Sequence, residues 1–280
     1  MIESLDHIAV AVRDLDRAAS AFGALLGRKA DWREEAAGAR HAWFQLANTA
    51  IDLVQADGPG ESGERVRAQI DAHGEGLWGL AFGVPDLDEA RRMLARRGAP
   101  VGEPADLLST DAWRLAFLDA AATHGVSIAL AERTGSVRAK PAAPDAVAAL
   151  DHVVINTTSP ERAVALYGAR LGLDFRLERS NPQWGSKLMF FRCGGAVVEV
   201  GARLGAGIDD APDRLSGLAW RIVDPDAAQA RLAKAGFDVS EVRPGRKPGT
   251  RVFTVRSGVP GAPTLMLSAE PGDATAQGTP

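Results

Sequence analysis

Residues 5–27 read LDHIAVAVRDLDRAASAFGALLG, and residues 150–172 read LDHVVINTTSPERAVALYGARLG. The two stretches align without a gap at an offset of 145 residues, which places His7 opposite His152. Internal similarity at a constant offset indicates that a chain arose by duplication of a structural unit. These stretches therefore predict two homologous halves.

A second pair of similar stretches lies further along each half. Residues 79–98 read GLAFGVPDLDEARRMLARRG, and residues 217–236 read GLAWRIVDPDAAQARLAKAG, at an offset of 138. Each stretch begins with apolar residues and continues into a helical pattern, as the first pair does. Each half is therefore predicted to hold two related units, and the whole chain four.

The first unit shows the local pattern that all four share. A β-rich stretch, residues 7–12, is followed by Asp14, whose carboxylate can cap a helix N-terminus. The apolar residues that follow recur at helical spacing up to Gly27, a residue type that often ends helices. Shorter strands, predicted at 41–46 and 50–55, complete the unit. We expect the four helices to begin near Leu15, Leu87, Pro160 and Pro225.

The division of the chain follows from these repeats. We predict a first domain at residues 1–135, with units near 1–60 and 77–133, and a second at 149–270, with units near 149–204 and 217–270. The segment 136–148 is rich in Ala, Pro and basic residues and is interpreted as a linker. Residues 271–280 are interpreted as a disordered tail.

Composition limits the class of protein. Hydrophobic residues make up 46% and charged residues 24%, as is typical of soluble globular proteins. A net charge of −4 argues against nucleic-acid binding, and no apolar run is long enough to cross a membrane. The start has no signal-peptide pattern, and the single cysteine, Cys193, excludes an internal disulfide. We expect a cytoplasmic protein, a monomer or a homodimer, whose partner is a small-molecule ligand.

The repeated order of strand, helix and three strands, with a His on the first strand, resembles the vicinal oxygen chelate superfamily. That superfamily includes glyoxalase I, methylmalonyl-CoA epimerase, extradiol dioxygenases and bleomycin-resistance proteins. The first half is most similar to the epimerases, through DHIAVAVRDLDRA, HGEGLWGLAFGVPDLDEA and RLAFLDAAATHGVSIALAE. The resemblance implies an α+β fold: four βαβββ modules that form two half-barrel domains by tandem duplication. It also implies one divalent metal per half-barrel, bound by a His and a Glu or Gln from each of two modules.

Transfer of these ligand positions to the chain gives an incomplete set in each half. The first and third modules retain a His and a carboxylate, and the second and fourth modules have lost both. The retained residues are His7, Asp52, His152 and Glu199. The residues at the other ligand positions are Gly79, Ala129, Gly217 and Met266.

These replacements cannot donate to Mg, Mn or Fe as imidazole or a carboxylate would. We therefore expect no tightly bound cofactor, and iron-dependent ring cleavage is disfavoured. One arrangement would restore a divalent metal (Mn, Fe, Ni or Zn): a barrel shared by the first and third modules would unite the four retained residues. The pairing of modules one with two and three with four, or one with four and two with three, leaves them apart.

The candidate catalytic residues are His152 and Glu199, because imidazole titrates near neutral pH and a carboxylate in an apolar strand usually faces a cleft. The same two residues could instead be relics of an ancestral metal site. Trp220, Trp78 and His41 are candidate substrate-binding residues; packing in the core is the competing interpretation for each.

Two functions stay open at this point. The first is an enzyme with lyase or isomerase chemistry next to a carbonyl group of a small oxygen-rich molecule. The second is a protein of the bleomycin-resistance type that binds and sequesters a small molecule without a metal. The missing ligands favour the second, and the retained His–carboxylate pairs favour the first.

Overall fold

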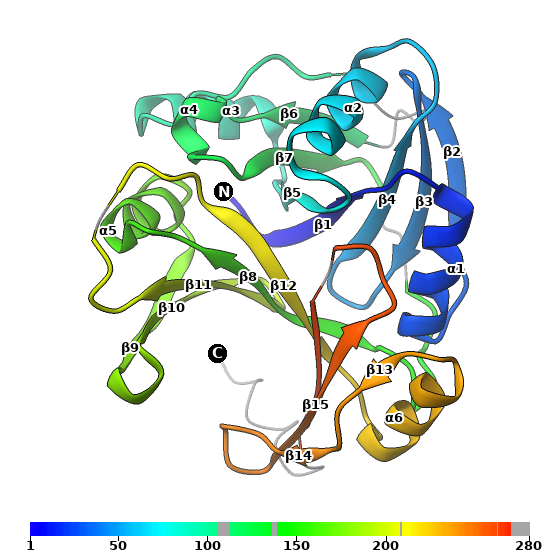
Figure 1. The fold of residues 1–280 in the computed structure, drawn as a ribbon. Helices are drawn as coiled ribbons and strands as arrows, with labels where there is room; N and C mark the ends of the chain where they lie inside the picture. The colour runs from blue at the N-terminus through cyan, green and yellow to red at the C-terminus, as the bar shows by residue number, and fades with distance from the viewer. Residues whose placement is uncertain (106–112, 136–138, 208, 262, 270–280) are drawn as a thin grey trace.

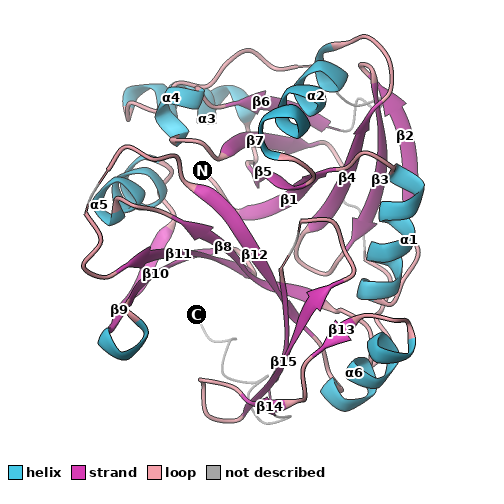
Figure 2. Cartoon of the chain, in the orientation of Figure 1, coloured by secondary structure: helices cyan, strands magenta, loops and turns pink. Residues whose placement is uncertain are grey.

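Two strongly curled sheets, one from each half of the chain, make up the molecule (Figure 1). The computed structural model describes residues 1–105, 113–135, 139–207, 209–261 and 263–269. Helices α1 (Leu15–Leu26), α3 (Leu87–Arg96) and α6 (Pro225–Lys234) lie on the outside of the sheets (Figure 2), whereas α2 (Glu61–His73) packs against the inner face of the first sheet. The predicted fold class, four modules in two half-barrels, is confirmed.

The first sheet has seven strands in the spatial order β2–β3–β4–β1–β5–β7–β6. Their bounds are β1 Ser4–Ala11, β2 Trp32–Ala36, β3 Ala39–Gln45, β4 Ala50–Ala56, β5 Gly76–Gly83, β6 Trp113–Phe117 and β7 Ser127–Arg133. The second sheet follows the order β13–β15–β16–β12–β8–β11–β10–β9, and β14 pairs with β15. Its strands are β8 Ala149–Asn156, β9 Asp174–Asn181, β10 Ser186–Cys193, β11 Ala196–Arg203, β12 Arg214–Arg221, β13 Asp238–Val239, β14 Arg243–Pro244, β15 Thr250–Ser257 and β16 Thr264–Ala269.

The pairing of β1 with β5, and of β8 with β12, decides which modules share a sheet. Both pairs are antiparallel and join the first strand of one module to the first strand of the next. Module one therefore pairs with two, and module three with four. The shared barrel of modules one and three does not form.

All four predicted helix starts are confirmed: α1 (Leu15–Leu26), α3 (Leu87–Arg96), α5 (Pro160–Ala163) and α6 (Pro225–Lys234) begin at the predicted residues. The Asp14 carboxylate accepts a hydrogen bond from the Arg17 N–H at 3.0 Å, and Gly27 ends α1 with φ of 71°. Such caps satisfy backbone groups that the helix leaves unpaired. Helix α5 continues as a π-helix over Val164–Arg170.

Helix α2 (Glu61–His73), between the two modules of the first half, was not predicted. Its buried side includes only two large apolar residues, Val66 and Ile70, so its hydrophobic pattern is weak. The fall in repeat offset from 145 to 138 shows that this connection is seven residues longer in the first half. The described residues of the matching connection, 204–207 and 209–213, contain no helix.

Glycines hold the start of α2 against the turn between β2 and β3. A Cβ atom on Gly63 would lie 2.1 Å from the carbonyl oxygen of Gly38, and one on Gly38 would lie 2.4 Å from that of Pro59. The Gly63 N–H also donates to the Ala37 carbonyl at 3.1 Å. Only glycine permits backbones to approach this closely.

The outer faces of both sheets contribute to one hydrophobic core that joins the halves. Ile8 and Val10 of β1 and Val153 and Ile155 of β8 are all fully buried in it. Asn48 adds polar contacts: its side chain donates to the carbonyl groups of Leu150 and Gly195, both at 2.8 Å, and accepts from the Leu150 N–H. The two halves therefore pack as one body.

The segment interpreted as a linker is partly built into this core. Ala146 and Val147 are buried, and the Val147 N–H donates to the Leu26 carbonyl at 3.0 Å. Residues 136–138 and the predicted tail, 271–280, lie outside the described residues. Within the described part of the chain, no helix is long and apolar enough to cross a membrane.

Candidate functional site

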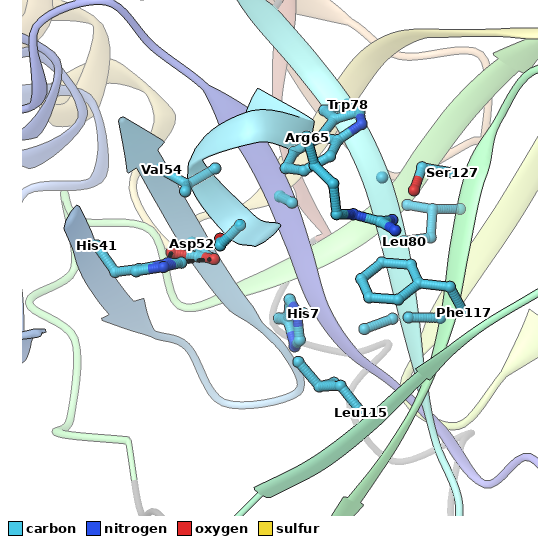
Figure 3. Close-up of a pocket in the computed structure, with 15 residues that line it drawn as sticks. His7, His41, Asp52, Val54, Arg65, Trp78, Leu80, Leu115, Phe117 and Ser127 are labelled. Atoms are coloured by element: carbon cyan, nitrogen blue, oxygen red, sulfur yellow. Dashed lines mark hydrogen bonds and ion pairs between the residues drawn. The ribbon is translucent and has the colours of Figure 1, made fainter. Parts of the chain in front are cut away.

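The inner face of the first sheet and helix α2 enclose a pocket of about 550 Å³, part of it open to solvent (Figure 3). Its walls are mostly apolar. Six polar or charged side chains interrupt them, and these are His7, His41, Asp52, Ser62, Arg65 and Ser127. An apolar cavity with a few convergent polar groups is the usual form of a small-molecule site.

His41 and Asp52 form a buried pair on neighbouring strands β3 and β4. The His41 Nδ1 atom lies 3.0 Å from each carboxylate oxygen of Asp52, and the two residues are 3% and 5% exposed. The His41 Nε2 atom is buried and has no hydrogen-bond partner among the described residues. Burial lowers the pKa of His41, but the charge and hydrogen bond of Asp52 and the charge of Glu34 outweigh it, so the pKa is raised. A His oriented by a carboxylate in this way can transfer protons near neutral pH.

His7 lies on β1 and is held from behind by a second carboxylate. Its Nδ1 atom lies 2.7 Å from Asp6, which also accepts a hydrogen bond from Arg133 Nε at 2.5 Å. Burial raises the pKa of Asp6, yet the hydrogen bonds and charges of His7 and Arg133 prevail and the pKa is lowered. Asp6 therefore stays ionised and orients His7, which leaves the Nε2 side of His7 for the pocket.

Three tryptophans pack together behind His7, outside the lining of the pocket. Trp43 is fully buried, with its ring centroid 4.4 Å from that of Trp113 and 5.4 Å from that of Trp32. The His7 ring meets Trp43 edge-on at a centroid distance of 5.1 Å. This cluster fixes the His7 ring by packing on its faces and edge.

Arg65 reaches into the pocket from α2. Its guanidinium carbon lies 3.6 Å from the ring centroid of Phe117 and 6.0 Å from that of Trp78. The Arg65 Nε atom is buried without a hydrogen-bond partner. Figure 3 shows the guanidinium near Phe117 and Ser127, across the pocket from the His41–Asp52 pair. Burial lowers the pKa of Arg65, against the charge of Glu61, which raises it.

Of the candidate substrate-binding residues, Trp78 and His41 line this pocket. A register shift in the β1–β5 pairing makes Trp78 the extra residue of a bulge, which turns its ring toward α2. Trp220 is placed differently. It is fully buried in the core on the outer face, opposite Met266 on β16, so it does not contact the inner face.

The donor set does not fit a divalent metal of the family's kind. Gly79 and Ala129 occupy two of the four positions in the first pocket and offer no side-chain donor. His41, the further imidazole in the pocket, is hydrogen bonded directly to Asp52. No group of three or more His, Cys, Asp or Glu side chains among the described residues is arranged to hold a metal ion.

The shared site of His7, Asp52, His152 and Glu199 is excluded, because the first two residues lie on one sheet and the last two on the other. The fourth-module position also needs correction. In the first half, Ala129 lies opposite Ala81. The residue that corresponds to Ala81 in the second half is Ala219, and Leu265 lies opposite it. Leu265, not Met266, therefore occupies the ligand position. Met266 is turned into the core.

The second sheet carries the other retained pair. His152 Nε2 lies 3.6 Å from Glu199 Oε2, and His152 Nδ1 lies 2.8 Å from Asp151, which is bound in turn by Arg221. Burial raises the pKa of Glu199, although the charges of His152 and Arg246 oppose the shift. No helix like α2 covers this pair in the described residues, and the side chains of His152 and Glu199 are 19% and 16% exposed, against 8% for His7 and 7% for Asp52.

A family model described as the glyoxalase/bleomycin resistance protein/dioxygenase superfamily matches residues 6–117 and 151–254. The chain belongs to this superfamily. The two matched segments lie in one half-barrel each, in agreement with the duplication of the sheets. No curated protein matches the sequence significantly.

Solved structures of the superfamily share the fold at low sequence identity. A mutant 4-hydroxymandelate synthase from Streptomyces coelicolor is 16% identical, with a TM-score of 0.70 over 96% of this chain and 93% of its own. A Mn(II)-bound glyoxalase from Novosphingobium aromaticivorans is also 16% identical, with a TM-score of 0.68 over 95% of this chain and 82% of its own. A methylmalonyl-CoA epimerase from Streptomyces coelicolor is 25% identical over 50% of this chain and all of its own, with a TM-score of 0.42.

Proposed function

We propose that the first half-barrel binds a small oxygen-rich organic molecule and moves a proton next to its carbonyl group, in lyase or isomerase chemistry. The buried Nε2 atom of His41 carries this proposal. Buried polar atoms in proteins are nearly always hydrogen bonded, so an unpaired one at the wall of a pocket calls for a partner on a ligand.

The roles of the residues follow from their positions. Asp52 holds His41 in one orientation and stabilises its protonated form, as the carboxylate of a catalytic triad does. His41 then accepts or returns the proton, and the apolar walls and α2 exclude water. His7, oriented by Asp6, can donate or accept a hydrogen bond at a second oxygen of the ligand.

Exchange of carbon-bound hydrogen for solvent deuterium measures this proton transfer directly. The probes are pyruvate, 2-oxobutanoate and hydroxyacetone in D2O, followed by NMR. We expect the wild-type protein to accelerate exchange of at least one probe, and His41→Gln to lower that rate about a hundredfold or more. Asp52→Asn should lower it as well. Ligand binding by a wild-type protein that promotes no exchange would instead establish the alternative, a metal-free binding protein.

The proposed site works without a resident metal, because Gly79 and Ala129 provide no ligands. We expect elemental analysis after dialysis against a chelator to find far less than one Mn, Fe, Ni or Zn per chain. Deuterium exchange should also be unchanged by the chelator. One equivalent of such a metal that survives dialysis would contradict the proposal.

The second half provides a second candidate, in which His152 and Glu199 form the proton-transfer pair. Their 3.6 Å separation on the inner face favours it. Because burial raises the pKa of Glu199, its charge is destabilising in the folded protein at neutral pH, and Glu199→Gln should leave the melting temperature equal or slightly higher. If this half is active, the same variant should abolish exchange. Deuterium exchange at the wild-type rate in Glu199→Gln would show that His152 and Glu199 are relics of an ancestral site with no role in proton transfer.

A further inference from the structure

We propose that the pocket selects a small monocarboxylate, and that Arg65 is the residue that binds its carboxylate group. This inference rests on the proposed function, because it concerns the same pocket, and it names the class of substrate.

The guanidinium of Arg65 lies in the pocket without an ion-pair partner, which favours binding of an anion there. Its side chain enters the pocket from α2, and no ion pair or hydrogen bond reaches its guanidinium from the described residues. A charged group taken out of water without a partner is costly, and such groups in proteins are normally paired. The face of Phe117 compensates only in part, since a ring provides no hydrogen-bond acceptor of carboxylate strength.

The charge of the pocket limits that anion to a single negative charge. Arg65 is the only Arg or Lys among the lining residues, and the carboxylate whose charge acts on it, the exposed Glu61 one turn earlier on α2, forms no ion pair with it. On the opposite wall, Asp52 is already paired with His41, so this pair adds no free cation. A dianion such as a phosphate monoester would therefore meet only one free cation for its two negative charges. A carboxylate matches the planar fork of the guanidinium through two parallel hydrogen bonds.

The lining between the two ends of the pocket is apolar, and this indicates the chemistry of the rest of the ligand. Ala9, Val54, Ala81, Leu115 and Ala129 line it, and none of these side chains has a polar atom. The ligand therefore has a carboxylate at the Arg65 end, a short hydrocarbon body, and an oxygen function within reach of His41 or His7. The described residues of the second half have no helix in the position of α2, so this selection is confined to the first half.

Matched pairs of probes test the inference by calorimetric titration. Butyrate, benzoate and phenylacetate are compared with their primary amides, and inorganic phosphate is titrated separately. We expect at least one carboxylate to bind and its amide to bind at least tenfold more weakly. Arg65→Gln should weaken carboxylate binding about ten- to a hundredfold, and Arg65→Lys less. The control is Arg67→Gln, which removes the same charge from an exposed position on α2 and should change nothing.

Three results would overturn the inference: no carboxylate binds the wild-type protein, amides or phosphate bind as well as carboxylates, or Arg65→Gln binds like the wild type. These results are separable from failure of the proposed function. If only proton transfer fails, carboxylates bind through Arg65 and no probe exchanges deuterium. If only this inference fails, exchange persists in Arg65→Gln, and the neutral probe hydroxyacetone exchanges as fast as pyruvate.

Discussion

Gly63→Ala should detach helix α2 from the pocket while the two sheets remain folded. The new methyl group would lie 2.1 Å from the Gly38 carbonyl oxygen, and a backbone atom cannot move aside as a flexible side chain could. Overpacking of this kind costs about 1–3 kcal/mol. Because Arg65 lies two residues further along the helix, its guanidinium should leave its place beside Phe117.

Hydrogen exchange followed by mass spectrometry distinguishes this local effect from global unfolding. We expect faster exchange in peptides that cover residues 57–75 and unchanged protection in β1, β4 and β5, together with loss of carboxylate binding. Ala68→Val, which adds bulk at an exposed position of the same helix, is the control and should keep both properties. Wild-type protection of residues 57–75 in Gly63→Ala would show that the contact can relax.

Trp43→Ala should be the most destabilising single substitution in the tryptophan cluster beside the pocket. The side chain is fully buried between Trp32, Trp113 and His7, and its indole N–H donates to Glu34 at 2.8 Å. Truncation of a buried Trp to Ala typically costs 3–5 kcal/mol. Thermal and urea unfolding should both show the loss, and the His7 ring should lose its fixed orientation.

The matched control is Trp184→Ala in the second half. Trp184 is 56% exposed and makes one cation–π contact with Arg246, so its removal should cost less than about 1 kcal/mol. Similar losses of stability in the two variants would contradict the view that the tryptophan cluster forms part of the core.

The repeats and helix starts could be predicted because their signals are local. Asp14 and Asp224 lie directly before a helix, and each carboxylate accepts from a backbone N–H three residues later. Module pairing could not be predicted in this way, since it depends on contacts between strands far apart in the sequence. Helix α2 was missed because its stability comes from Gly63 and two apolar residues that meet their partners only in the folded state.

The candidate site was predicted in part. Asp52 and His41 were both singled out, but as a metal ligand and a substrate contact, and their direct pairing was not foreseen. The hairpin register would have indicated it: Val54 lies opposite His41, which puts Asp52 diagonally across on the same face. Trp220 was misjudged because it lies two residues after Leu218 on β12, and both side chains therefore face the core. No pattern in the sequence could reveal that Arg65 enters a pocket without an acidic partner.

The tryptophan cluster also makes the protein its own optical reporter. The chain has six tryptophans; Trp78 lines the pocket, and Trp32, Trp43 and Trp113 form the cluster beside His7. The centroid of the His7 ring lies 5.1 Å from that of Trp43, close enough for a protonated imidazole to quench indole emission. Occupancy of the pocket should therefore appear in the intrinsic fluorescence, and the second half, with only Trp184 and Trp220, should contribute a nearly constant background.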